Sequence, residues 1–278
     1  MDTSNAKADN VRKVGIVAGY GQFPVLFATA AKKRGFSVYA AAHVNETEPV
    51  LEECLDGVVW VHLGELGRIF DFFAGHGVRD AVMAGGIHKV RAFGDLRLDE
   101  HALRVLATLD HTQDDSVLRA FATALEEQGI AIRPSTWLLP EILAPPGLWT
   151  GTPLSDEQAA DVAHGFNVAR KIGEMDVGQC VVVKKGSVVA VEAIEGTDAT
   201  IRRGGELAGD GCVVVKVCKP NQDPRFDLPA CGLDTVRTLA AAGASVLAVE
   251  AGRSIVFDKD SAVSLADELG IALMGVGE

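Results

Sequence analysis

Short apolar runs alternate with amphipathic segments in the first half of the chain. Each run is bounded by glycine or polar residues, which is typical of a buried strand, and the segments between the runs are typical of helices. This alternation predicts an α/β fold with a Rossmann-like, doubly wound parallel sheet. The expected strands are residues 14–18, 37–42, 58–63 and 80–84, and the expected helices are residues 25–33, 66–74 and 117–128.

The pattern is interrupted once, where prolines and a glycine crowd residues 139–153. Such residues break both helices and strands, so we expect a domain boundary in this stretch. The N-terminal Rossmann-like domain would then comprise residues 11–145. The C-terminal domain, residues 152–278, is expected to be α/β with a mixed sheet.

The second domain should begin with a long helix and then a β-hairpin. Ser155 and Gln158 fit a capping box that opens a helix running to about Gly173. Two apolar runs around a turn at residues 185–187 predict the hairpin. Further strands are expected at residues 212–218, 245–250 and 271–276, and further helices at residues 235–242, where Asp234 would be the cap, and 261–269.

Two glycine-rich turns follow expected strands of the first domain. Because parallel strands end at one edge of a sheet, both turns should lie on the same rim and could bind an anion or a nucleoside. A tight turn without a ligand is an equal alternative. The third glycine of the dinucleotide fingerprint falls at Pro24, and the second strand ends at His43 rather than at an acid, which disfavours a nicotinamide cofactor. The candidate contacts are Gly19, Gly21, Gln22, Gly85, Gly86 and Lys89.

Charges of both signs gather between residues 191 and 235, around two apolar segments. A solvated surface would scatter such charges, whereas an anion and metal site needs acids for a hard cation and bases for oxyanions. Prolines stiffen the loop that carries several of these charges, which favours a fixed constellation. The candidates are Glu192, Glu195, Asp198, Arg202, Lys216, Lys219, Asp223, Arg225 and Asp227, with Asn167 on the preceding helix.

Composition narrows the classes of function. The formal net charge is -12, and no Lys/Arg stripe is present to replace phosphate counterions, so a nucleic-acid partner is not expected. The five cysteines form no C-x-x-C pair, which argues against structural zinc and favours buried thiols in a reducing compartment. The N-terminus is polar and no apolar run approaches spanning length, so we expect a cytoplasmic protein.

The sequence resembles one enzyme family in four motifs: G-I-V-A-G-Y-G-Q-F-P near the start, Gly178–Gln179, V-E-A-I-E-G-T-D, and K-P-N-Q-D-P-R-F-D-L-P. This is the metal-dependent UDP-2,3-diacylglucosamine diphosphatase family, which some Gram-negative bacteria use in lipid A synthesis in place of the calcineurin-like enzyme. The resemblance covers nearly the whole chain from Val14. It implies a two-domain hydrolase that splits a lipid-linked UDP-sugar into UMP and 2,3-diacylglucosamine 1-phosphate, assisted by a divalent cation such as Mg²⁺.

Pyrophosphate cleavage needs neutralised phosphate oxygens, an activated water and a stabilised leaving phosphate, and the residue types for each are present. We expect metal holding or water activation from Asp227 and Glu195, with Asp198 or Asp223, a further metal ligand in Glu192, and phosphate binding by Lys216, Lys219 and Arg225. Two alternatives stay open, a nicotinamide-dependent oxidoreductase and a non-catalytic protein that binds nucleotide sugars or lipids. The lipid-linked substrate is compatible with transient contact with the inner membrane surface, and an oligomer is compatible with the sequence.

Overall fold

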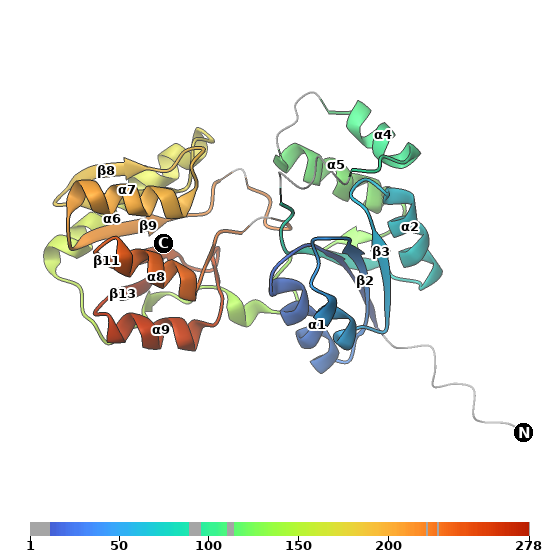
Figure 1. The fold of residues 1–278 in the computed structure, drawn as a ribbon, viewed down its shortest axis with the longest axis horizontal. Coiled ribbons are helices and arrows are strands. Elements are labelled where there is room, and N and C mark those ends of the chain that lie inside the picture. Colours follow the sequence, from blue (N-terminus) through green and yellow to red (C-terminus); the bar gives the residue numbers. More distant parts are fainter. Residues whose placement is uncertain (1–11, 89–95, 110–113, 221, 227, 278) are drawn as a thin grey trace, which may run out of the picture. The chain divides into compact units, whose positions relative to one another are not determined.

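The computed structural model describes residues 12–88, 96–109, 114–220, 222–226 and 228–277 (Figure 1). Its contacts divide the chain into two compact units. The first contains the chain up to Pro140 together with Pro224–Phe226, and the second contains Glu141–Asp223 and the chain from residue 227. The division therefore lies within the proline-rich stretch, and the return of three residues to the first unit had no counterpart in the sequence pattern.

A parallel sheet forms the centre of unit 1, with five strands in the order β3-β2-β1-β4-β5. All four pairings between neighbouring strands are parallel, which confirms the expected doubly wound sheet. Strands β1 and β4 are buried along nearly their whole length because helices cover both faces. The strands are β1 (Lys13–Ala18), β2 (Ser37–His43), β3 (Gly57–Val61), β4 (Asp80–Ala84) and β5 (Ala131–Ile132).

The helices of unit 1 lie between its strands in the chain. Phe73 of α2 and Leu125 of α5 are fully buried against Val17 and Ala41, so these two helices cover the same face of the sheet. Helix α1 contacts β1 and β2, with Phe27 fully buried. The helices are α1 (Phe23–Lys33), α2 (Leu66–Gly75), α4 (Glu100–Ala107) and α5 (Asp114–Glu127), with a 3-10 helix, η1, at Pro49–Cys54.

Unit 2 contains the expected mixed sheet, in the order β6-β13-β11-β9-β7-β8. Strands β9, β11 and β13 are parallel, whereas β7 is antiparallel to both of its neighbours and β6 is antiparallel to β13. The strands are β6 (Gly147–Leu148), β7 (Cys180–Lys184), β8 (Ser187–Val191), β9 (Cys212–Lys216), β11 (Ala244–Glu250) and β13 (Ala272–Val276). A separate parallel pair joins β10 (Ala230–Cys231) to β12 (Ile255–Val256).

Helices cover both faces of this sheet (Figure 1). Helix α6 packs on one face, where Val162 and Ala169 lie in a buried cluster with Val181 and Val215. Residues of α7, α8 and α9 form the cluster on the other face. Burial on both faces explains why the first four residues of β7 and of β9 are apolar in their shared sequence C-V-V-V-K. The helices are α6 (Asp156–Glu174), α7 (Thr197–Ala208), α8 (Leu233–Ala241) and α9 (Lys259–Glu268), with a 3-10 helix, η2, at Pro140–Ile142.

Local polar contacts fix the start of α6 and the hairpin turn. Ser155 and Gln158 form the expected capping box, each side chain bonded to the backbone N–H of the other. The turn between β7 and β8 has positive φ at Lys185 and Gly186, as a two-residue hairpin turn requires. The buried carboxylate of Asp161 accepts both turn N–H groups, at 2.9 and 2.6 Å. This pairing ties α6 to the hairpin.

The cap expected at Asp234 was wrong by two residues. Helix α8 begins at Leu233 with Gly232 as its N-cap, and Asp234 lies in the first turn, where a carboxylate favours the positive end of the helix dipole. The side-chain hydroxyl of Thr235 accepts a hydrogen bond from the Gly232 N–H at 3.3 Å. The helix therefore starts earlier than the acidic residue suggested.

The cysteines are all free thiols, with Cys54 half-buried and the other four buried. Burial raises the pKa of Cys180 to about 12 and that of Cys231 to about 11. Both thiols are therefore protonated at neutral pH and act as small apolar core residues. Among the described residues, no helix combines the length and the apolar character needed to cross a bilayer.

Candidate functional site

The carboxyl ends of β1 and β4 form the rim of unit 1. Two turns meet there through backbone bonds: Gly19 N–H donates to Ala84 O at 2.8 Å, and Tyr20 and Gly86 exchange N–H donors at 2.8 and 3.1 Å. A Cβ on Gly19 would lie 2.1 Å from Gly86 O, and one on Gly85 would lie 2.6 Å from Tyr20 O. Gly19 and Gly85 therefore let the two turns approach each other, and the N–H groups of Gly19 and Gly86 are used within the fold. Gly21, with φ of +93°, has open space at its Cβ position, and Gln22 is the N-cap of α1.

We expect Gly19→Ala to lower the free energy of unfolding of unit 1 by about 3 kcal/mol. The new methyl group would overlap the backbone oxygen of Gly86, which cannot move without breaking its hydrogen bond with the Tyr20 N–H. Gly75→Ala is the matched control. Gly75 ends α2 and has no atom within 4 Å of its Cβ position, so alanine should be neutral or stabilise by about 0.5 kcal/mol. Urea unfolding of both variants measures this difference. Equal midpoints would contradict the close approach of the turns.

A histidine next to these turns is held by a carboxylate. His88 Nδ1 lies 2.7 Å from Glu46 Oε2, and the His88 backbone N–H donates to the same oxygen at 3.2 Å. The Glu46 side chain is only 7% exposed, and the Tyr20 ring stacks on His88 with 3.9 Å between ring centroids. The imidazole is therefore fixed at the rim of unit 1. The sequence carried no signal for this pair, because Glu46 and His88 come from different loops. Lys89, expected beside the glycines, lies outside the described residues.

An apolar cavity of about 260 Å³ lies within unit 1 below this rim. Gly19 and Gly85 line it at the rim, and the wall also contains residues from the strands, from the segment between β3 and α2, from α4 and α5, and from the segment before α4. The wall side chains include Val17, Met83, Leu98, Val105, Leu118 and Phe121. Its size approaches that of small-molecule sites, and its wall suits a hydrocarbon chain rather than a nucleotide.

His43 lines the same cavity and is buried, 7% exposed. Burial lowers its pKa from the ordinary value of 6.5, against the effect of the hydrogen bond between Nδ1 and Ala18 O at 2.9 Å. A neutral imidazole donates that bond. The folded state therefore resists protonation of this side chain at pH values where the unfolded chain accepts a proton.

We expect the stability of unit 1 to fall as the pH drops below 6.5, because the unfolded state then binds a proton that folded His43 does not. The loss is at most about 1.4 kcal/mol per pH unit. In His43→Asn a side-chain amide can still donate to Ala18 O but does not titrate. Thermal unfolding at pH 7.5 and 5.5 should show a smaller pH dependence in the variant. The same dependence in both proteins would exclude His43 as its source.

The rim of unit 2 is the edge at which β9 and β11 end and antiparallel β7 begins. Cys180, the first residue of β7, pairs with Lys216, the last residue of β9. Strand β8 ends at Val191, and Glu192 follows at the same edge, where its N–H donates to Cys180 O at 2.8 Å. Helix α7 begins five residues later, with Gly196 as an N-cap that has no side chain. This edge therefore combines a carboxylate, a lysine and the positive end of a helix dipole.

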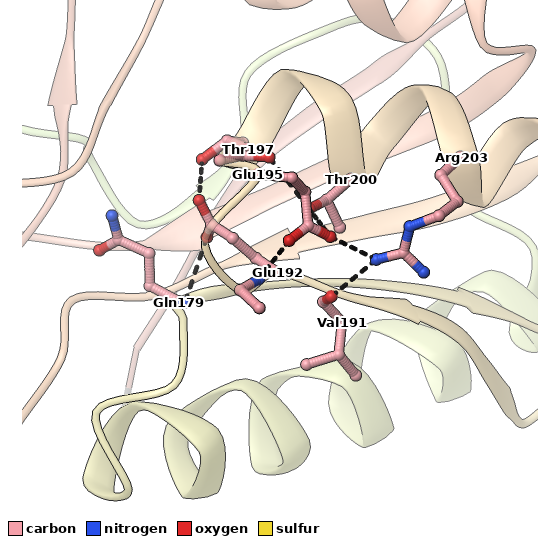
Figure 2. A network of polar contacts seen from close by, with 9 residues as sticks. Gln179, Val191, Glu192, Glu195, Thr197, Thr200 and Arg203 are labelled. Atoms are coloured by element: carbon pink, nitrogen blue, oxygen red, sulfur yellow. Dashed lines mark hydrogen bonds and ion pairs between the residues drawn. The ribbon is translucent and has the colours of Figure 1, made fainter. Parts of the chain in front are cut away.

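The Glu192 carboxylate is buried, with 7% exposure, and each of its oxygens accepts one hydrogen bond (Figure 2). Thr197 Oγ1 donates at 2.8 Å and the Gln179 N–H donates at 3.2 Å. Gly178 is required beside it, because a Cβ there would lie 2.0 Å from Glu192 O. These contacts explain why a carboxylate is tolerated next to an apolar strand.

Glu195 was expected to end the strand but lies in the turn between Glu192 and α7. Arg203 Nη2 donates to Glu195 Oε1 at 2.6 Å and to Val191 O at 2.9 Å, which joins the turn to α7 (Figure 2). The backbone N–H of Glu195 and, second, the Arg203 guanidinium hold the pKa of the Glu195 carboxyl below its ordinary value. The group is thus ionised at neutral pH, so it suits a cation or an orienting contact better than proton donation.

Basic side chains follow β9 at the same edge. Lys216 Nζ donates to Ala230 O at 3.0 Å, and Lys219 Nζ pairs with Asp176 at 2.8 Å. Both lysines lie where β9 leads into the loop that contains Pro220, Pro224 and Pro229. Two cationic groups are therefore fixed near the end of one strand, as binding of oxyanions requires.

Glu250 ends β11 beside this segment and is also buried, 7% exposed. Its Oε2 accepts from the Cys218 N–H at 2.9 Å, and Arg253 donates to Oε1 at 3.3 Å. The buried carboxylate therefore holds the start of the loop after β9 in place. In these contacts Glu250 orients the loop that follows β9.

The structure brings only part of the expected set together. Among the candidates, Glu192, Glu195 and Lys216 meet at the rim of unit 2, with Asp198 exposed in the first turn of α7 and Lys219 on the adjoining loop. Asn167 and Arg202 are exposed on α6 and α7, Asp223 is half-buried in the loop, and Arg225 belongs to unit 1. Asp227 lies outside the described residues. Within the described part of the chain, no three His, Cys, Asp or Glu side chains converge on a point that could hold a metal ion.

Sequence reasoning used Gln179 only as part of a motif, but the structure gives it a polar role. Its N–H binds Glu192, while its side-chain oxygen is buried and, within the described residues, has no hydrogen-bond partner. A buried acceptor without a donor is costly, so it is a candidate contact for a ligand N–H or O–H. The glutamine next to a required glycine was the only sequence signal.

Comparison with known proteins gives matches along nearly the whole chain. A model described as the LpxI N-terminal domain matches residues 13–142, and one described as the LpxI C-terminal domain matches residues 145–274. The UDP-2,3-diacylglucosamine pyrophosphatase LpxI of Caulobacter vibrioides is 34% identical over 277 residues, which span 96% of this chain and 98% of that protein. Both units are therefore represented in that relative.

Two solved structures show distant likeness to this chain. The biotin carboxylase domain of Hydrogenobacter thermophilus 2-oxoglutarate carboxylase matches with a TM-score of 0.28 at 15% identity, over 63% of this chain and 35% of that chain. N5-carboxyaminoimidazole ribonucleotide synthetase from Thermotoga maritima matches with a TM-score of 0.27 at 16% identity, over 67% and 42% of the two chains. Such scores carry no argument about this chain.

Proposed function

The chain belongs to the LpxI family, and we infer that it hydrolyses the pyrophosphate bond of UDP-2,3-diacylglucosamine in lipid A biosynthesis. The products are UMP and 2,3-diacylglucosamine 1-phosphate. The observation that carries this function is the match through both units to a relative with this activity in its name. The charged rim of unit 2 and the apolar cavity of unit 1 support it, because the substrate has a pyrophosphate and two acyl chains.

The rim of unit 2 is the proposed site of phosphate binding. Lys216 and Lys219 supply positive charge, and the N-terminal amides of α7 supply further donors because Gly196 has no side chain to cap them. Such donors stabilise the charge that develops on the pyrophosphate oxygens and on the leaving phosphate. The buried oxygen of Gln179 would accept a hydrogen bond from a donor of the nucleotide or the sugar.

We assign a divalent cation such as Mg²⁺ to this rim. Mg²⁺ is usually held by one or two carboxylates together with substrate phosphates, and Glu192 and Glu195 provide carboxylate oxygens at one edge. When bound, the cation would neutralise phosphate charge and make a water more acidic.

The remaining acids are assigned to the water and its orientation. Asp227 is the main candidate for a catalytic carboxylate, and the other acids are Asp223, four residues earlier in the sequence, and Asp198 in the first turn of α7. The backbone N–H of Glu195 and then Arg203 hold the pKa of the Glu195 carboxyl below its ordinary value, so this carboxylate can accept from a water or contribute to the cation site. A carboxylate that takes the proton of the attacking water completes the hydrolysis.

The apolar cavity of unit 1 is the proposed site for one acyl chain. Burial of each methylene contributes about 0.8 kcal/mol, so even part of a chain in this cavity would hold the substrate firmly. A substrate with two acyl chains resides in a membrane, and we propose transient contact of this protein with the membrane surface during substrate uptake. Oligomer formation remains a proposal that sedimentation can test.

The function is tested by incubating the purified protein with UDP-2,3-diacylglucosamine and Mg²⁺ and following release of UMP. We expect turnover without added nicotinamide cofactor. Binding without turnover would point to the non-catalytic alternative, and a requirement for NAD(P) would point to an oxidoreductase. UDP-glucose is a useful control substrate, because it retains the pyrophosphate and lacks the acyl chains that the cavity would hold.

A further inference from the structure

Three residues of the loop after β9 belong to unit 1. Arg225 Nη1 lies 2.9 Å from Oε1 of Glu126, the second-to-last residue of α5, and both residues are inside the first unit. Phe226 packs against the buried cluster of that unit. The Arg225 guanidinium also lies 4.9 Å from the centroid of the Phe226 ring. An ion pair and an aromatic ring therefore hold the segment Pro224–Phe226 against the rest of unit 1. We call the segment seated when these contacts are made, and unseated when they are broken.

The two acids nearest this segment are candidates for the chemistry. Asp223 directly precedes Pro224, and Asp227 directly follows Phe226. Consecutive Cα atoms are about 3.8 Å apart, so the position of this segment restricts where Asp223 can lie. Pro224 has a fixed φ and also limits the backbone conformations of Asp223. These restrictions reduce the motion of Asp223 relative to the seated segment.

We propose that Glu126 is a positioning residue for the reaction, acting through Arg225. Its carboxylate holds the Arg225 guanidinium, which keeps Pro224–Phe226 in contact with the rest of unit 1 and fixes the loop next to Asp223. This inference rests on the proposed function. It gives Arg225 a role as an anchor for the catalytic loop in place of the phosphate contact expected from the sequence.

The ion pair should increase the fraction of molecules in which Pro224–Phe226 is seated, but it should not be the main interaction that holds the segment. The side chains of Arg225 and Glu126 are 28% and 43% exposed, and pairs of this kind are screened by water. Phe226 supplies the apolar part of the seat, so the segment should remain mostly seated when the pair is broken. Loss of the pair should therefore raise the unseated fraction by about fivefold without unfolding the unit.

Limited proteolysis with trypsin measures the unseated fraction of Pro224–Phe226, and the measurement does not depend on enzyme activity. Cleavage after Arg225 requires the segment to leave unit 1, so the rate of formation of the peptide end at Arg225, followed by mass spectrometry, reports the unseated fraction. We expect Glu126→Gln to raise this rate by about fivefold. Glu127→Gln is the matched control, because it removes the same charge from the next residue of α5. An unchanged rate in Glu126→Gln, or an equal rise in both variants, would overturn the proposal.

Kinetics then test positioning. A loosened loop lowers the fraction of bound substrate that meets correctly placed acids, so kcat of Glu126→Gln should fall about tenfold while KM stays within about twofold. The control variant should keep both values, and the melting temperatures of both variants should match that of the unmodified protein. Faster cleavage by trypsin with an unchanged kcat, or a changed KM alone, would overturn the positioning role. Lack of turnover in the unmodified protein would refute the proposed function and leave the cleavage result standing.

Discussion

Excess EDTA is expected to reduce the release of UMP by at least about 10³-fold, because the substrate pyrophosphate would lose the cation that neutralises its charge and acidifies the attacking water. Among the described residues at the rim of unit 2 are Lys216, Lys219 and the N-terminus of α7, and both lysines already donate to protein acceptors. These donors alone leave much of the pyrophosphate charge uncompensated. The carboxylates Glu192 and Glu195 suit a hard divalent cation rather than zinc.

The control is recovery of the rate when Mg²⁺ is returned in excess of the chelator. Chelation should leave the circular dichroism spectrum unchanged, because the carboxylates of the rim are bound to protein donors: Glu192 to Thr197 and Gln179, and Glu195 to Arg203. Full activity in EDTA would exclude the proposed cation. Unfolding in EDTA would indicate a structural metal instead.

The second large effect is expected for Asp227→Ala, which should lower kcat by about 10³-fold or more while substrate binding is retained. In the sequence, Asp227 stands between Phe226 and Leu228, and Pro224 and Pro229 restrict the backbone on either side of it. A carboxylate in such a loop is better suited to chemistry than to core packing. Equilibrium binding of the substrate to the variant separates loss of chemistry from loss of affinity.

Asp234→Ala provides the comparison for this variant. Asp234 lies seven residues further along the chain, and its side chain is 92% exposed in an ion pair with Arg237 on α8. Its removal should leave kcat and KM unchanged, because exposed pairs of this kind contribute little. A near-normal rate in Asp227→Ala would remove that residue from the mechanism and would direct attention to Asp223 and Asp198.

The order and type of most elements were predictable because local physics decides them. Strand β4 occupies the expected residues, and the capping box of α6 is formed by the expected pair, Ser155 and Gln158. Apolar period, turn residues and caps act within a few positions of the chain, so they are visible in the sequence. Helix α4 and the two-residue strand β5 were missed, since short elements carry few positions from which a period can be recognised.

The sequence by itself determined the fold class, the concentration of opposite charges between residues 191 and 235, and the motifs that indicate the family. Only the tertiary structure decided which of those charges meet. It placed Glu192 beside Gln179 and Thr197, held His88 with Glu46, and paired Arg225 with Glu126, a residue 99 positions away. Side-chain partners at such separations depend on how strands and helices pack. A one-dimensional pattern has no term for that packing, which is why it identified the charged stretch and left the partner of each charge undetermined.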